Sequence, residues 1–201
     1  MRLALAAAFA LALVSGSAAS AMGVKSQDPA DAPAGTWVLD KAHASVTAKV
    51  KHMGFSDYTM RFDKFDASYT YDPAKPEASQ INVTLDANSL DVGDPKVSAQ
   101  FAKEFLAADK APTVTFASTA IHRDDPAHGT VTGDLTFRGV TKPVTLTLTF
   151  NGVGGGMMPG SHRAGFSGTA TIKRSDFGSD YLQGIVGDEV NLLIEAEFTP
   201  K

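Results

Sequence analysis

Hydrophobic and polar residues alternate along two neighbouring runs in the second half of the chain, 131–138 and 144–150. In the first run, Leu135 and Phe137 fall on one face and polar residues on the other, because successive side chains of a β-strand point to opposite sides. In the second run, valine, leucine and phenylalanine alternate with threonine. Gly139 gives the backbone freedom for a turn between the runs. The pattern predicts a β-hairpin with one apolar face.

The same period of two recurs on both sides of this hairpin, with turn-forming residues in between. It predicts further half-buried strands over 37–39, 45–52, 61–71, 81–86, 113–121, 163–173 and 190–198. A glycine-dense stretch, 151–161, interrupts the series and is expected to be a mobile loop. About eight short strands joined by polar turns indicate an all-β antiparallel sandwich or barrel, and the periodicity alone does not distinguish the two.

One segment departs from the β pattern. Asp94 can cap a helix that runs from Pro95 to Ala108, since proline suits the first helical position. Val97, Phe101 and Phe105 follow at intervals of four residues and form a single apolar stripe. We therefore expect one short amphipathic helix, which either packs on the sheet or gates a cavity or partner site.

The N-terminus has the three-part layout of a secretory signal peptide. An arginine precedes a short apolar run, and small residues ending in Ala19-Ser20-Ala21 follow it. Residues 1–21 are therefore expected to be a cleaved signal peptide and the protein to be periplasmic; an uncleaved anchor is the alternative. Residues 22–35 are rich in Pro, Ala, Asp and Gly, which predicts a flexible linker. A single domain is expected over 36–201.

Composition excludes several kinds of function. The net charge is −4 and the lysines are scattered, so no basic surface is available for nucleic acid. The chain has no cysteine and no G-x-S-x-G motif, which removes two common nucleophiles. Its five histidines lack metal-ligand spacing, and the best cluster, 122–128, is typical of a solvated turn. We expect no catalytic residue and no metal.

The apolar face of the strands has two interpretations. Its phenylalanines, valines, leucines and isoleucines would converge inside a closed sheet. A closed sheet of about eight strands is either filled by side chains or holds one small ligand. The residue pattern leaves a filled core and a ligand cavity equally open.

Several separated motifs resemble those of a known family. They are D-x-x-H-x-S at 40–45, K-H-x-G-x-S at 51–56, the hairpin 131–144, Arg-Ser-Asp-Phe-Gly at 174–178 and Val-Gly-Asp-Glu-Val at 186–190. In this order, and spread from Trp37 to the C-terminus, they make the chain similar to the YceI-like family of periplasmic polyisoprenoid-binding proteins.

The resemblance implies a lipocalin-like, extended antiparallel eight-stranded β-barrel with one short helix, which encloses a long isoprenoid lipid. It implies no enzymatic activity and no cofactor, unless a bound isoprenoid lipid or quinone is counted as one. The lipid cavity is then expected to be lined by Val46, Val50, Phe62, Phe65, Ile81, Val83, Leu85, Phe101, Phe105, Val114, Phe116, Leu135, Phe137, Leu146, Leu148, Phe150, Phe166, Leu192 and Ile194. A membrane protein that donates or accepts the lipid would be a further partner, and both a monomer and a homodimer stay open.

Two other functions are kept as alternatives. His43, His52 and the methionines of the glycine-dense loop motivate a quinone-linked redox partner or a barrel enzyme of the periplasm. A structural or stress-related protein with a filled core is the second alternative, and a cavity in the barrel would argue against it.

Overall fold

The structure is a computed structural model that describes residues 23–201, so the expected signal peptide over 1–21 lies outside the described residues. The described part consists mainly of β-strands, with one α-helix and four short 3-10 helices. The strands are β1 (Gly23–Ser26), β2 (Gly35–His52), β3 (Ser56–Phe62), β4 (Phe65–Tyr71), β5 (Gln80–Asp86), β6 (Leu90–Asp91), β7 (Thr113–Arg123), β8 (His128–Phe137), β9 (Val140–Gly155), β10 (His162–Lys173) and β11 (Val186–Pro200). The α-helix is α1 (Pro95–Leu106), and the 3-10 helices are η1 (Pro29–Asp31), η2 (Pro76–Ala78), η3 (Ala87–Ser89) and η4 (Arg174–Phe177).

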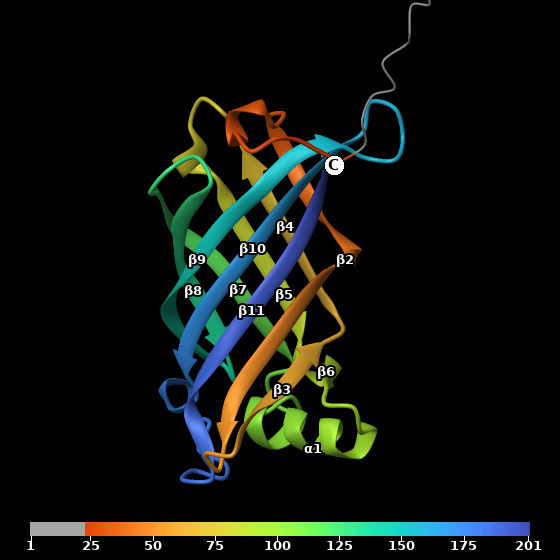
Figure 1. Cartoon of the computed structure of the whole chain (residues 1–201). Coiled ribbons are helices and arrows are strands. Elements are labelled where there is room, and N and C mark those ends of the chain that lie inside the picture. The colour runs from red at the N-terminus through yellow and green to blue at the C-terminus, as the bar shows by residue number, and fades with distance from the viewer. Residues whose placement is uncertain (1–22) are drawn as a thin grey trace, which may run out of the picture.

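The strands close into an antiparallel barrel of eight members (Figure 1). Around the ring the order is β2, β4, β5, β7, β8, β9, β10 and β11, and β11 pairs back onto β2. β2 is long enough to pair with two strands on its other side, β4 along its first part and β3 along its second. The predicted all-β barrel with a single α-helix is confirmed, and closure leaves the ring without free edges.

The predicted hairpin is formed by β8 and β9. Val131 lies opposite Leu146, both toward the barrel interior, while the hydroxyls of Thr132 and Thr145 meet on the outside at 2.9 Å. The turn is tight because Arg138 and Gly139 both adopt positive φ, at 55° and 76°. Two such residues match the right-handed twist of the flanking strands. The face assignment from the alternation is therefore confirmed.

Strand boundaries differ from the prediction in two places. The predicted strands 37–39 and 45–52 form one strand, β2, because the polar residues between them remain extended at a bulge opposite Ala196 and Phe198. Conversely, the predicted strand 61–71 is broken between Phe62 and Phe65. There the chain passes from β3 to β4. Both strands pair with the same side of β2, β4 with its first part and β3 with its second part.

Two predicted flexible segments are ordered instead. Within the predicted linker 22–35, β1 pairs with the end of β9. The hydroxyl of Tyr71 donates a 2.7 Å hydrogen bond to the Pro29 carbonyl, which fastens the same segment to the barrel. This pairing extends β9 through Gly155, so the predicted loop 151–161 is partly strand. Glycine suits this contact because a Cβ on Gly154 would collide with the backbone of Gly23.

Helix α1 lies across one end of the barrel, which we call the helix end (Figure 1). Its start is fixed by the Asp94 side chain, which accepts hydrogen bonds from the amides of Lys96 and Val97 at 2.8 and 3.1 Å. Ala107 ends it in a left-handed conformation. The predicted helix is thus confirmed, two residues shorter than expected. None of the helices in the described chain has the length and apolarity needed to cross a membrane.

Buried side chains gather toward the two ends of the barrel. One cluster surrounds Trp37, whose ring stacks on Tyr69 with centroids 5.9 Å apart, and it includes no residue of α1. The other cluster includes Phe62, Leu85 and Ala102 and lies beside α1. Besides these clusters, the barrel interior contains space that no side chain of residues 23–201 fills.

Candidate lipid-binding cavity

The barrel interior contains two apolar cavities arranged end to end. The lower cavity, of about 250 Å³, adjoins α1 and includes Phe101 and Phe105 in its lining. The upper cavity, of about 230 Å³, lies toward the opposite end and includes Tyr69 and Phe150. The structure therefore favours a hollow barrel over a filled core, which argues against the purely structural alternative.

The two cavities meet at a shared ring of side chains, which we call the waist. Its members line both cavities and come from five strands of the barrel: Val46, Val83, Phe116, Leu146 and Ile194. Because the same side chains face both spaces, the cavities are adjacent compartments of the barrel interior, which together we call the channel. An extended chain that fills both compartments has to pass between the waist side chains, whereas a compact ligand would occupy one compartment.

Every residue that the sequence predicts as lining is found on the wall of this channel. Five form the waist. Nine others face the lower cavity alone: Val50, Phe62, Leu85, Phe101, Phe105, Val114, Leu135, Phe137 and Leu192. The remaining five face the upper cavity alone: Phe65, Ile81, Leu148, Phe150 and Phe166. Their contact with a ligand stays a prediction.

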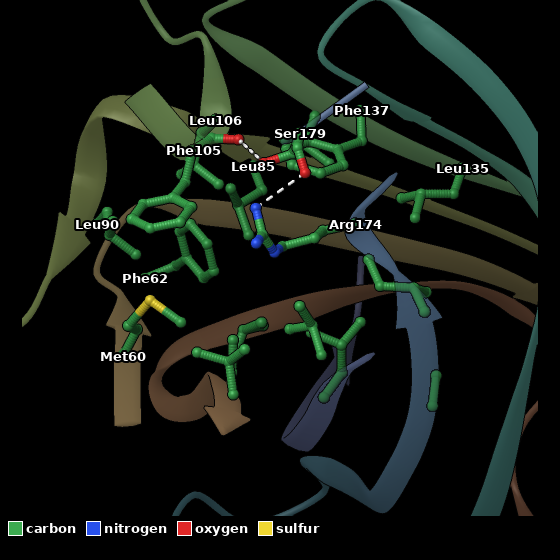
Figure 2. A pocket seen from close by; sticks show the side chains of 18 of the residues that line it. Met60, Phe62, Leu85, Leu90, Phe105, Leu106, Leu135, Phe137, Arg174 and Ser179 are labelled. Atoms are coloured by element: carbon green, nitrogen blue, oxygen red, sulfur yellow. Dashed lines mark hydrogen bonds between the residues drawn. The ribbon is translucent and has the colours of Figure 1, made fainter. Parts of the chain in front are cut away.

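Sequence reasoning missed two polar residues of the lower cavity, Arg174 and Ser179. Both are buried, with 4 % and 2 % of their surfaces exposed. Arg174 opens η4 and reaches across the barrel end, where Figure 2 shows it among apolar side chains. The motif at 174–178 contained Arg174, but no periodicity in the sequence signals that it points inward.

The guanidinium of Arg174 is held by backbone carbonyl groups. Its Nε donates to Gly187 at 2.9 Å, and Nη2 donates to Val186 at 3.0 Å. Its Nη1 donates to Ser179 at 2.9 Å and to Tyr181 at 2.8 Å. These bonds fix the segment between η4 and β11 against the barrel. The ring of Phe105 covers one face of the group, with its centroid 5.5 Å from Cζ.

Helix α1 is attached to the barrel mainly through its C-terminal end. Arg138, in the β8–β9 turn, donates from Nη1 to the carbonyls of Glu104 and Phe105 at 3.0 and 2.9 Å. The Ser179 hydroxyl donates to the same Phe105 carbonyl at 2.9 Å (Figure 2). Cations and donors are favourable there because the last carbonyls of a helix have no partners within it.

The apolar stripe of α1 joins a row of aromatic rings across the helix end. Tyr58, Phe101, Phe105 and Tyr181 follow one another with centroids 5.8, 5.1 and 5.0 Å apart, each pair edge to face. Both phenylalanines line the lower cavity and are only partly buried. The helix therefore forms a wall of the cavity.

The upper end carries a different set of polar groups. Tyr69 belongs to the lining of the upper cavity, and burial raises the pKa of its phenol well above the usual range, so it stays neutral. Outside the barrel, Arg163 forms ion pairs with Asp40, at 2.7 Å, and with Glu197. Burial alone would raise the pKa of Asp40, but hydrogen bonds from Arg163 and His43 hold it below its ordinary value.

The residues behind the redox alternative are not brought together. His43 bonds to Asp40 at 3.0 Å, whereas His52 lines the lower cavity nine residues further along β2. At ~3.3 Å per residue, this separates the two imidazoles by roughly 30 Å. Met157 and Met158 are exposed. Among residues 23–201, no three His, Cys, Asp or Glu side chains are grouped so as to hold a metal ion.

Comparison with solved structures agrees with this architecture. BcnA from Burkholderia cenocepacia matches with a TM-score of 0.69 and 32% identity, covering 79% of this chain and 98% of that one. The YceI protein of Campylobacter jejuni matches with a TM-score of 0.65 and 31% identity, over 76% and 91% of the two chains. A polyisoprenoid-binding domain from Saccharophagus degradans, at 13% identity and a TM-score of 0.60, shares the fold over 82% of this chain and 98% of its own.

Sequence comparison gives the same result. A UPF0312 protein of Pseudomonas savastanoi is 41% identical over 167 residues, which cover 80% of this chain and 85% of the relative. A UPF0312 protein of Pseudomonas aeruginosa is 37% identical over 183 residues, covering 90% and 95%. The model of the YceI-like domain matches residues 37–198, which is nearly the whole barrel. The chain therefore belongs to the YceI-like domain family.

Proposed function

We propose that the protein binds one long isoprenoid or related amphipathic lipid inside its barrel and carries it through the periplasm. The observation that carries the proposal is the apolar channel, whose two compartments join at the waist. The name of the Saccharophagus degradans domain, which has the same fold, supports polyisoprenoids as the ligand class.

The energetics of burial favour a long chain. Each CH₂ group removed from water contributes about 0.8 kcal/mol. Association itself costs roughly 4–15 kcal/mol in lost freedom. A chain of only a few carbons would barely offset that cost, and it would fill one compartment. A chain that passes the waist gains contacts in both.

The carrier role and the periplasmic location form the second part of the proposal. They are supported by the signal-like composition of 1–21, which lies outside the described residues. A carrier requires a donor and an acceptor of the lipid, and membrane proteins would serve as these partners. The protein would work as a monomer or a homodimer. Binding rather than catalysis is proposed because the channel wall is almost wholly apolar.

Purification under native conditions tests the binding role directly. The protein is isolated from the periplasmic fraction, extracted with organic solvent and analysed by mass spectrometry. We expect one molecule of a long-chain lipid per barrel. The delipidated protein should also bind a fluorescent apolar probe that added polyprenyl lipid displaces. Absence of lipid together with failure to displace the probe would contradict the proposal.

A further inference from the structure

The lower cavity contains a buried charge that lipid tails do not explain. Four polar or charged residues are buried in the described chain, and two of them, Arg174 and Ser179, line this cavity. Ser89 and Ser98 are the other two, and both hydroxyls are used in bonds to the backbone. Arg174 is thus the one fully buried charged side chain among residues 23–201.

The hydrogen bonds of Arg174 leave one of its N–H donors without an acceptor among residues 23–201. A guanidinium has five N–H groups. Four of them bond to the carbonyls of Ser179, Tyr181, Val186 and Gly187, through Nε, both hydrogens of Nη1 and one of Nη2. The second hydrogen of Nη2 has no acceptor within the described chain. One N–H of the group therefore remains available for an oxygen atom of a ligand.

Arg174 forms no ion pair within the described chain. All four of its acceptors are neutral carbonyls, and no carboxylate of residues 23–201 lies within ion-pair distance. The Asp188 carboxylate feels the charge from further away: its pKa is lowered mainly by hydrogen bonds from Ser175 and, to a smaller extent, by Arg174. A buried cation gains most from an anion that forms a charge-assisted hydrogen bond. Because Phe105 covers one face of the guanidinium, such an anion would approach in its plane, at the remaining N–H of Nη2.

Space for a polar group exists next to Arg174. A third pocket, of about 500 Å³, lies at the helix end and shares Arg174, Ser179 and Val186 with the lower cavity. Its other lining is mixed, with glycines and apolar residues beside the polar side chains of Lys51, Ser175, Gln183 and Asp188. The two bonds from Ser175 to Asp188, at 2.9 and 2.8 Å, already occupy this carboxylate and hold its pKa low. An amphipathic ligand could therefore extend its head group toward this pocket while its tail enters the channel.

The upper end offers a weaker site for a charged head group. Its buried polar group is the neutral phenol of Tyr69. Most charged and titratable groups around it are well exposed: the His122 and His128 side chains keep 73% and 56% of their surfaces exposed, and Asp125 lies beside His128. Arg123, which also lines the upper cavity, is half-buried and is the one cation among the described lining residues with less contact with water than the histidines. Water would screen their attraction for an anion.

We propose that Arg174 and Ser179 form a head-group subsite that takes an anionic oxygen head, a phosphate or a carboxylate, and so orients the lipid with its tail toward the waist. The inference rests on the proposed lipid-binding function and adds the chemistry and direction of the ligand. Arg174 would donate to the head group from its remaining Nη2 N–H, and the Ser179 hydroxyl, which donates to the Phe105 carbonyl, can still accept a hydrogen bond through its oxygen.

Three probes that share the same isoprenoid tail and differ only in the head group test the subsite. Geranylgeranyl phosphate, geranylgeranoic acid and geranylgeraniol are each titrated into the delipidated protein by calorimetry. We expect the phosphate, the acid or both to bind about tenfold or more tightly than the alcohol, as charge-assisted bonds are stronger than neutral ones. The anionic probe that binds with the higher affinity, phosphate or carboxylate, identifies the chemical class of the head group. Equal binding of all three probes overturns the inference and leaves the proposed function intact, whereas binding of none overturns both.

Two variants test whether Arg174 is the residue that causes the preference for an anionic head group. Arg174→Gln should bring the anion-to-alcohol affinity ratio close to one, and Arg61→Gln, a matched change at an exposed arginine of β3, should leave the ratio unchanged. Alcohol binding and circular dichroism report whether the Arg174 variant keeps its barrel. Should it unfold, the unmodified protein still decides the head-group preference. If folded Arg174→Gln keeps the anion-to-alcohol affinity ratio of the unmodified protein and Tyr69→Phe loses it, the head group lies at the upper end of the barrel. That result would overturn the inference.

Discussion

The hydroxyl of Ser179 donates a 2.9 Å hydrogen bond to the carbonyl of Phe105, joining residues 74 positions apart in the sequence. Phe105 belongs to the last turn of α1, and Ser179 belongs to the segment that Arg174 fixes. The bond therefore fastens the helix that covers the barrel end to the segment between η4 and β11. It acts together with the bonds from Arg138 to the same end of the helix.

Ser179→Ala should loosen α1 without unfolding the barrel. The Phe105 carbonyl keeps its bond from Arg138, so the loss in free energy of unfolding should be about 1 kcal/mol. Hydrogen exchange of the α1 amides should accelerate, and bound lipid should dissociate faster. Thr171→Ala removes an exposed hydroxyl bond to Asn191 and serves as the control. Equal rates of hydrogen exchange in the α1 amides of both variants would contradict the proposal that this bond fastens the helix.

Leu146→Trp should close the waist to long ligands. The larger side chain would enter the channel between its two compartments, where Leu146 lines both. We expect affinity for a polyprenyl chain that spans the channel to fall at least about tenfold, a loss on the order of two buried CH₂ groups. A short apolar probe should still bind. Thr147→Trp, on the outward face of the same strand, is the matched control, and equal effects of both variants would refute the waist.

Tyr71→Phe should release the N-terminal segment from the barrel. It removes the hydrogen bond to the Pro29 carbonyl, which contributes about 1 kcal/mol. Proteolysis of residues 23–33 should become faster, while the barrel stays resistant. Tyr58→Phe is the control, because the Tyr58 hydroxyl makes no hydrogen bond within the described chain. Unchanged proteolysis would show that β1 pairing alone holds the segment.

Asp40→Asn should destabilise the protein near neutral pH and lose its effect in acid. The pKa of Asp40 is lower in the folded state than its ordinary value of 3.8, so its carboxylate stabilises the fold above that value. This contribution disappears as the pH falls through the folded pKa. Urea unfolding at pH 7 and below pH 3 measures the difference between variant and parent. Asp109→Asn, at an exposed site, should show no pH-dependent difference.

The alternation in the sequence was sufficient to predict the strands and their inward faces, because it reports directly which face is buried. Leu135 and Phe137 point inward for the same reason that Thr136 points outward, and the lining follows strand by strand. Closure into a ring, by contrast, came from the family resemblance. Alternation gives the same pattern in a sandwich and in a barrel.

The missed features depend on contacts between distant residues. Residues 23–33 have the composition of a linker, yet Tyr71 and the end of β9 hold them in place. Arg174 sits in a polar stretch that periodicity assigns to the surface, and its burial depends on carbonyls from Ser179 to Gly187. Such residues are identified only when the chain segments that satisfy them are seen together.

Pairing between β2 and β11 also has a consequence for folding. Trp37 lies opposite Pro200 and His52 opposite Val186, so the first and last strands of the ring are neighbours. The other ring contacts join segments closer in sequence, whereas this one spans nearly the whole described chain, which raises contact order and slows folding. Until β11 docks, the sheet has two unpaired edges and its apolar wall faces solvent. Pairing of the two chain ends therefore both encloses the ligand cavity and removes the exposed edges that favour aggregation.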